Sequence, residues 1–121
     1  MHEPIAIANA YLDTWNQRAA AQRQALLAQH WSADARYVDP LMAGQGTAQI
    51  GGLIAAVHER FPHFRFALLG KPDGHGDYVR LSWSLGPDRG EPPIEGSDVV
   101  RLRDGRIHAV IGFIDRAPAA L

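Results

Sequence analysis

Asp98 is the residue whose position in this sequence most favours acid–base chemistry. Apolar and polar residues alternate around it, which places Asp98 on the same face of a predicted strand as Val100 and Leu102. That apolar face should be directed into the protein, where burial disfavours an ionised carboxyl group and raises its pKa. Because no Lys or Arg shares the face, we expect Asp98 to be neutral at pH 7. The alternative is a structural carboxyl group that satisfies a buried hydroxyl or backbone amide.

Asp39 is the second candidate for acid–base chemistry. It ends a predicted strand, shares a face with Ala35 and Tyr37, and precedes Pro40. An Asp before Pro commonly caps a turn, which is the structural alternative. Beside a loop, its carboxyl group should be better solvated than that of Asp98 and stay ionised. Two carboxyl groups in such different environments suit separate acid and base roles.

The aromatic and histidine candidates are Tyr11, Trp15, His58 and Trp83. Tyr11 and Trp15 lie four residues apart on one side of a predicted helix, and Trp83 belongs to an alternating strand pattern. We expect these four residues, together with the two aspartates, to line one cavity that binds a small apolar organic ligand. Packing in the core explains the aromatic residues equally well, and His58 also fits a solvent-facing helix end.

Several other chemistries are excluded by what the sequence lacks. There is no cysteine, and no two histidines have the spacing of a zinc-binding helix. Gly-x-Gly-x-x-Gly, Walker A and Gly-x-Ser-x-Gly patterns are also absent. We therefore expect neither a metal ion nor another cofactor.

The elements that must position these residues follow from the hydrophobic periodicity. A helical period predicts helices over residues 5–18, 20–30 and 47–60, the last with Thr47 as its N-cap. The predicted strands are residues 35–39, 64–68, 78–85, 94–103 and 106–115, with turns at 71–74, 86–93 and 104–105. Helices followed by an antiparallel meander predict an α+β fold, in which the sheet wraps around one layer of helices.

Charge and composition fit one soluble globular domain. The 12 Lys and Arg residues nearly balance 13 Asp and Glu residues, and 46% of the residues are hydrophobic. A balanced charge gives no electrostatic field that would favour nucleic acid or an acidic membrane. The first residues have neither the positive charge nor the apolar run of a signal peptide, so we expect a cytoplasmic protein without a membrane span.

The order of these elements and several segments resemble the nuclear transport factor 2-like superfamily, in its SnoaL-like, ketosteroid-isomerase-like branch. The segments that carry the resemblance are residues 9–16 (NAYLDTWN), 33–40 (ADARYVDP), 46–47 (GT), 96–102 (GSDVVRL), 104–107 (DGRI) and 112–115 (GFID). They cover nearly the whole chain, so we expect residues 1–121 to form a single SnoaL-like domain. The resemblance implies a curved sheet and three helices that enclose a conical pocket, in a homodimer.

Within this resemblance, three residues match the catalytic pattern of ketosteroid isomerase. Asp39 matches the general base, while Tyr11 and Asp98 match the two groups that donate hydrogen bonds to the enolate oxygen. The implied reaction moves a proton from the carbon next to a carbonyl group. The expected substrate-binding residues are Trp15, His58, Trp83 and Phe113. The family's tyrosines that support the oxyanion tyrosine are replaced here by Trp31 and Ile54.

Three other functions fit the same fold. A ligand-binding or dimerisation module without catalysis is the alternative of a different class, because this fold hosts enzymes and binding proteins alike. A polyketide aldol cyclase needs a similar acid–base carboxyl group and a similar apolar pocket. A limonene-type epoxide hydrolase is disfavoured, since Gly96 stands where its arginine is required and residues 110–112 (VIG) hold no acid.

A homodimer is also predicted from the two last strands. Their alternation directs Val99, Val110 and Ile114 to the face opposite the pocket. An apolar outer face of this kind is usually covered by a partner. We therefore expect two copies of the chain to associate through the sheet.

Overall fold

The computed structural model describes residues 3–119, which form three helices and six strands. The helices are α1 (Pro4–Asn16), α2 (Ala20–His30) and α3 (Thr47–Arg60). The strands are β1 (Trp31–Val38), β2 (Ala43–Gln45), β3 (Arg65–His75), β4 (Tyr78–Gly86), β5 (Ile94–Arg103) and β6 (Arg106–Arg116). The predicted α+β class is confirmed, and each helix boundary lies within two residues of its predicted place.

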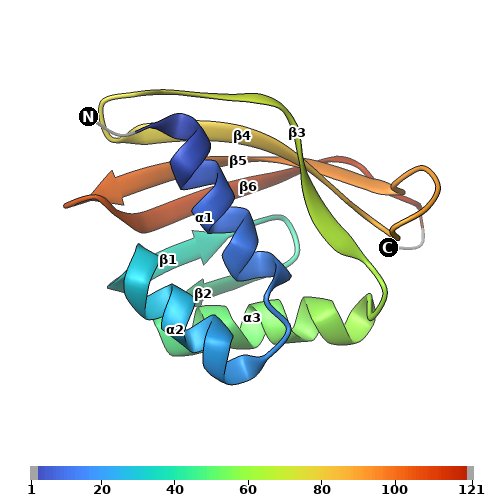
Figure 1. Cartoon of the computed structure of the whole chain (residues 1–121), viewed down its shortest axis with the longest axis horizontal. Helices are drawn as coiled ribbons and strands as arrows, with labels where there is room; N and C mark the ends of the chain where they lie inside the picture. The colour runs from blue at the N-terminus through green and yellow to red at the C-terminus, as the bar shows by residue number, and fades with distance from the viewer. Residues whose placement is uncertain (1–2, 120–121) are drawn as a thin grey trace.

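All six strands join one curved, open and mixed sheet in the order β2-β1-β6-β5-β4-β3 (Figure 1). β1 and β6 run parallel, and every other neighbouring pair is antiparallel. The parallel pairing brings Val38, at the end of β1, level with Ile111 in the middle of β6. Because β6 also pairs with β5, residues at the end of β1 and in the middle of β5 lie on either side of β6.

The three helices pack on the sheet and on one another. Figure 1 shows α1 crossing in front of the strands. It packs against β3 and β4, while α2 and α3 pack against β1 and against each other. The buried side of α1 carries Ala8, Tyr11, Leu12 and Trp15, which have the spacing of one helix face. The core of the protein therefore lies between this side of α1 and the sheet.

The start of α3 differs from the prediction. Its N-cap is Gly46, with φ of 85°, and Thr47 is the first residue of the helix. A positive φ is strained for a residue with a side chain, which explains glycine at this position. Further along α3, a Cβ atom on Gly51 would collide with the side chain of Gln24, so this glycine allows α2 to approach closely.

The turn predicted at residues 71–74 is wrong. This segment belongs to β3, and the chain turns instead at Gly76 and Asp77, before β4. Pro72 is tolerated inside the strand because β3 is an edge strand. The pairing of β3 with β4 is also irregular between Leu69 and Asp73, so the proline does not interrupt a regular ladder.

A β-bulge in β6 changes which residues of this strand face inward. Arg101 pairs with Ala109 and Leu102 pairs with Ile107, so His108 is one extra residue on β6. Because successive side chains alternate between the two faces, one extra residue moves every later side chain to the opposite face.

The predicted outer face of β6 is therefore wrong. Val110 is buried, and Ile114 lines the interior cavity described below. Ile111 and Phe113 are the residues that β6 exposes on the outer face. Val99, which pairs with Ile111 from β5, lies on that face as predicted.

Candidate active site

A cavity of about 290 Å³ lies between α1, α3 and the sheet. Its wall is mainly apolar and aromatic, with residues that include Leu12, Val57, Phe66, Leu85 and Ile94. Five of the six residues expected to share a cavity line it, namely Tyr11, Trp15, Asp39, Trp83 and Asp98. The structure thus brings together groups from α1, β1, β4 and β5 that are far apart in the sequence.

Asp98 is the most deeply buried acid of the cavity, with 2% of its surface exposed. Its Oδ2 accepts a hydrogen bond of 2.6 Å from the Tyr11 hydroxyl, while Oδ1 is buried without a hydrogen-bond partner. Burial raises the pKa of Asp98 to about 6; the polar hydrogens of Tyr11 and Trp83 oppose this rise, and the charge of Asp39 adds to it. The predicted direction is found, since burial moves the pKa of Asp98 from the ordinary value towards neutral pH.

Asp39 directly follows β1, and both of its oxygens are engaged. Oδ1 accepts hydrogen bonds from the backbone N–H groups of Leu41 (2.8 Å) and Met42 (2.9 Å), and Oδ2 accepts one from the Tyr37 hydroxyl (2.6 Å). The backbone contacts form the turn expected of an Asp before Pro. Sequence analysis did not assign Tyr37 a role at the site, although its position two residues before Asp39 on one strand face could have revealed the contact.

Gly112 separates the two aspartates. On one side, Gly112 of β6 pairs with Asp98 of β5. On the other side it lies level with Asp39, because Ile111 and Val38, the residues just before Gly112 and Asp39, pair between the parallel strands β6 and β1. A Cβ atom on Gly112 would lie 2.8 Å from Asp98 Oδ1 and 3.2 Å from the Cβ atom of Asp39. The missing side chain therefore makes room for Asp98 Oδ1 and for the Cβ atom of Asp39 on the inner face of the sheet.

Tyr11 is positioned by packing as well as by its bond to Asp98. The ring of Trp31 stacks on it, with centroids 5.6 Å apart, and Trp31 Nε1 donates to Thr14 Oγ1. Ile54, the other replacement of a supporting tyrosine, is fully buried. Burial raises the pKa of the Tyr11 hydroxyl, and the charge of Asp98 adds to this rise, so the hydroxyl stays protonated and donates to Asp98.

Trp15, which lines the same cavity, has an unsatisfied donor. Its ring packs against Tyr37 and Phe66, with centroid distances of 5.3 and 5.5 Å. Its Nε1 is buried without a hydrogen-bond partner, and it lies near enough to the Tyr11 hydroxyl to lower the pKa of that group. Buried polar groups normally have a partner. In the described part of the chain, two buried atoms of cavity-lining residues thus have no hydrogen-bond partner, the donor Trp15 Nε1–H and the acceptor Asp98 Oδ1.

Comparison with known proteins identifies the family. Residues 8–110 match the model of the SnoaL-like domain. The chain belongs to the SnoaL-like family. A protein from Agrobacterium tumefaciens str. C58, described as a "putative isomerase of the SnoaL-like family", is 44% identical. Its solved structure matches with a TM-score of 0.90, over 95% of this chain and 99% of that one. No curated protein matches the sequence significantly.

More distant solved structures share the fold of this SnoaL-like protein. A "putative ketosteroid isomerase" from Kribbella flavida DSM 17836 is 19% identical, with a TM-score of 0.70 over 95% of this chain and 79% of that one. A de novo designed protein with a curved sheet is 15% identical, with a TM-score of 0.72 over 95% and 88% of the two chains. Such similarity shows the fold alone. Since a designed protein shares the fold, the function must be argued from the site.

Two expected substrate-binding residues of the SnoaL-like protein lie outside the cavity. His58 is in the last turn of α3, where its Nε2 lies 2.6 Å from the carbonyl oxygen of Trp15. Its ring lines a neighbouring polar depression, and burial lowers its pKa. Phe113 is 54% exposed on the outer face of the sheet, because the bulge at His108 reverses the faces of β6.

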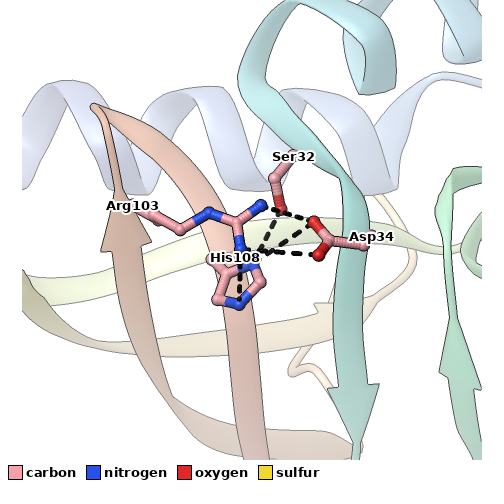
Figure 2. A network of polar contacts seen from close by, with 4 residues as sticks. All are labelled: Ser32, Asp34, Arg103 and His108. Atoms are coloured by element: carbon pink, nitrogen blue, oxygen red, sulfur yellow. Dashed lines mark hydrogen bonds and ion pairs between the residues drawn. The ribbon is translucent and has the colours of Figure 1, made fainter.

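A second polar cluster joins a serine, a histidine and an aspartate where β1 lies beside β6 (Figure 2). Ser32 Oγ lies 2.9 Å from His108 Nδ1, and Asp34 Oδ1 lies 3.7 Å from the same nitrogen. A nucleophilic triad needs the serine and the acid on different ring nitrogens. Here the other nitrogen, Nε2, lies 3.5 Å from Arg103 Nη1, and Arg103 also binds Asp34 at 2.6 Å. The cluster therefore links β1 to β5 and β6 and lacks the geometry of a triad.

Residues 3–119 contain no group of three or more His, Asp or Glu side chains arranged to hold a metal ion. Nor does any helix in this range have the length and apolar character needed to cross a membrane.

Proposed function

We propose that this protein is an isomerase-type enzyme that moves a proton from the carbon next to a carbonyl group of a small, largely apolar substrate. The proposal is carried by two buried, unsatisfied atoms of residues that line the cavity, Trp15 Nε1 and Asp98 Oδ1. Such a reaction needs a base for the proton and a donor for the charge that develops on the carbonyl oxygen. The isomerase description of the 44% identical relative supports the same reaction class.

We assign the role of base to Asp98. Its Oδ1 has no hydrogen bond to give up, and a pKa of about 6 makes it a stronger base than an exposed carboxylate while leaving it ionised at neutral pH. Asp98 Oδ1 takes the proton, and the C–H electron pair becomes the C=C bond of an enolate. The negative charge moves to the oxygen, which accepts a hydrogen bond from Trp15 Nε1–H. Asp98 then returns the proton to a different carbon, which completes the shift of the double bond.

Asp39, the base expected from the family resemblance, receives a different role. Tyr37, Leu41 and Met42 donate three hydrogen bonds to its oxygens. Its negative charge helps to raise the pKa of Asp98. Asp39 thus acts through Asp98 by keeping that carboxylate basic, and Tyr11 holds Asp98 in place.

The pH dependence of kcat/KM for a small β,γ-unsaturated ketone tests this assignment. If Asp98 is the base, kcat/KM rises with pH through about 6 and is constant above it, since the free enzyme must carry the ionised form. If Asp39 were the base and protonated Asp98 the oxyanion donor, kcat/KM would instead fall through the same pH.

Two variants complete the test. Asp98→Asn should abolish turnover because no base remains at the free position. Asp39→Asn should keep turnover, and its kcat/KM should rise with pH at a lower pH than in the wild type, because the loss of the Asp39 charge lowers the pKa of Asp98.

Wild-type turnover no faster than that of Asp98→Asn at any pH would refute the proposal of an isomerase and leave the non-catalytic binding module as the function. An aldol cyclisation begins with the same proton removal, so a cyclase substrate would depend on the same residues.

A further inference from the structure

Arg60 is the cationic residue at the open end of the cavity. It is the single Lys or Arg among the described residues that line the cavity, and the two carboxyl groups of this lining belong to Asp39 and Asp98. Asp98 is almost completely buried, whereas Arg60, Leu41 and Ala56 are exposed. The cavity is therefore closed at Asp98 and open at the arginine.

The guanidinium of Arg60 lies on an ordered aromatic platform. Its Cζ atom is 5.6 Å from the centroid of the Phe61 ring, which is a cation–π distance. Phe61 stacks on Phe64, with centroids 5.1 Å apart and an interplanar angle of 12°. Arg18 Nη2 donates to the carbonyl oxygens of both phenylalanines, at 3.2 and 2.7 Å. This part of the cavity mouth is thus organised before any ligand binds.

Arg60 forms no ion pair with another side chain within residues 3–119. A cation in the last turn of α3 interacts favourably with the helix dipole, which explains the positive charge in general terms. The dipole does not explain why this arginine lines the cavity and has no acidic partner there. A guanidinium presents a planar set of donors that matches a carboxylate, and pairs of this kind are frequently bidentate.

We infer that the substrate carries a carboxylate at the end that stays in the cavity mouth, where Arg60 binds it. The inference rests on the proposed function, which places the reacting carbonyl group between Trp15 and Asp98, and it specifies the substrate as a small keto acid. The cavity volume of about 290 Å³ lies at the lower limit of the roughly 300–1,000 Å³ usual for ligand sites. A compact substrate therefore spans from the buried carboxyl group to the arginine.

A binding experiment tests the inference without requiring turnover. β-Naphthol and a hydroxynaphthoate with its carboxylate on the second ring present the same phenol to Trp15 and Asp98. By calorimetry at low ionic strength, the wild type should bind the hydroxynaphthoate about 3–10-fold more tightly than the naphthol, because only the former pairs with Arg60. Added salt should reduce this ratio, since the arginine is exposed.

Three variants separate Arg60 from the general charge of the surface. Arg60→Gln should bind the two probes equally, and Arg60→Glu should prefer the uncharged naphthol. Arg65→Gln is the matched control, because Arg65 lines the neighbouring polar depression and not the cavity. It should keep the preference of the wild type for the carboxylate.

The inference would be overturned if the wild type bound both probes equally or bound neither. It would also be overturned if Arg60→Gln kept the preference for the hydroxynaphthoate. Failure of the proposed function has a different signature. The preference for the carboxylate would remain in the wild type, but no unsaturated ketone, with or without a carboxylate, would react faster than with Asp98→Asn.

Discussion

Gly112 and Asp98 face each other across β5 and β6, and the missing side chain of Gly112 makes room for Asp98 Oδ1. A Cβ atom at position 112 would lie 2.8 Å from this oxygen, closer than real Cβ contacts come. The oxygen of the proposed base therefore lies in the space that a side chain at position 112 would occupy.

Gly112→Ala should consequently impair catalysis more than stability. The added methyl group has to displace Asp98 Oδ1, and a misplacement of about 1 Å can cost on the order of 10² in rate. Overpacking of this kind typically costs about 1–3 kcal/mol of stability. Steady-state kinetics and thermal unfolding measure the two effects separately.

Gly52→Ala is the matched control for this substitution. A Cβ atom on Gly52 meets nothing within 4 Å, and the residue lies inside α3. Alanine is the better helix former by up to about 1 kcal/mol, so this variant should be fully active and slightly more stable. Full activity of Gly112→Ala would contradict the assignment of Asp98 Oδ1 as the reacting atom.

Asp98 should also make the stability of the protein depend on pH. Its folded-state pKa of about 6 lies above the ordinary value of 3.8, so the folded protein binds this proton more tightly than the unfolded chain. The stabilising contribution is fully present below about pH 4 and is lost as pH rises through about 6. A shift of about two pKa units corresponds to roughly 3 kcal/mol. The free energy of unfolding is lower by this amount above about pH 6, where the buried carboxyl group is ionised.

Asp98→Asn removes this cost, so its Tm should exceed that of the wild type at pH 8. The difference should shrink as the pH is lowered towards 4, which thermal unfolding at a series of pH values would measure. Asp13→Asn, at an exposed position of α1, is the control, and its difference in Tm from the wild type should not grow between pH 4 and pH 8 as that of Asp98→Asn does. A difference in Tm between Asp98→Asn and the wild type that does not change with pH would show that burial does not shift the titration of Asp98.

The orientation of Asp98 could be predicted from the sequence because β5 is regular around it. Its pairing with β4 is uninterrupted from Ile94 to Arg101, so the period of two gives the correct face. The same reasoning failed on β6, where His108 is an extra residue. Neither His108 nor its neighbours are Gly or Pro, so no residue type there indicates a bulge. The wrong expectation for Phe113 follows from this single residue.

Trp15→Phe should lower kcat more than it lowers the stability of the fold. The substitution keeps an aromatic ring against Tyr37 and removes an N–H group that has no partner in the folded protein. Removing one donor to a developing oxyanion typically costs about 10²–10³ in kcat. Steady-state kinetics would show the loss of kcat, and chemical unfolding would show a modest decrease in the free energy of unfolding from the packing lost with the larger ring.

Trp31→Phe is the matched control and should lower the stability of the fold with little effect on kcat. Trp31 Nε1 donates to Thr14, so its loss should cost about 0.5–1.5 kcal/mol of stability. Because Trp31 does not line the cavity, kcat should change little. Equal kinetic effects of the two substitutions would show that the indole of Trp15 has no special role in the reaction.

Hydrogen-bond partners in the site could not be predicted from the sequence alone. The bond between Tyr11 and Asp98 joins residues 87 positions apart. Spacing could place both residues on inward faces, but whether an oxygen of Asp98 stays unpaired depends on Gly112 across the sheet. The engagement of Asp39 by Tyr37 likewise depends on how the chain turns after β1. For this reason the sequence identified both carboxyl groups, but it could not show the hydrogen bonds that bear on the role of base, which the resemblance gives to Asp39.

The outer face of the sheet carries an apolar patch that contains one of the three predicted residues, Val99, beside residues that were not predicted. Val38, Ile111 and Phe113 are 46%, 51% and 54% exposed. Val38 pairs with Ile111 from one side and Val99 pairs with it from the other, so adjacent strands present one continuous surface. Contiguous exposed apolar surface of this kind marks a site of association.

We expect two copies of the chain to form a homodimer through this patch. Light scattering at micromolar concentration should then give twice the chain mass of 13.2 kDa. Ile111→Lys should give monomers, because a charge buried in an apolar interface loses its hydration without gaining a partner. Ile5→Lys introduces the same charge at an exposed apolar residue of α1 and should stay dimeric. A wild-type mass of 13.2 kDa would contradict the dimer, and a dimer that persists in Ile111→Lys would mean that the interface lies on another surface.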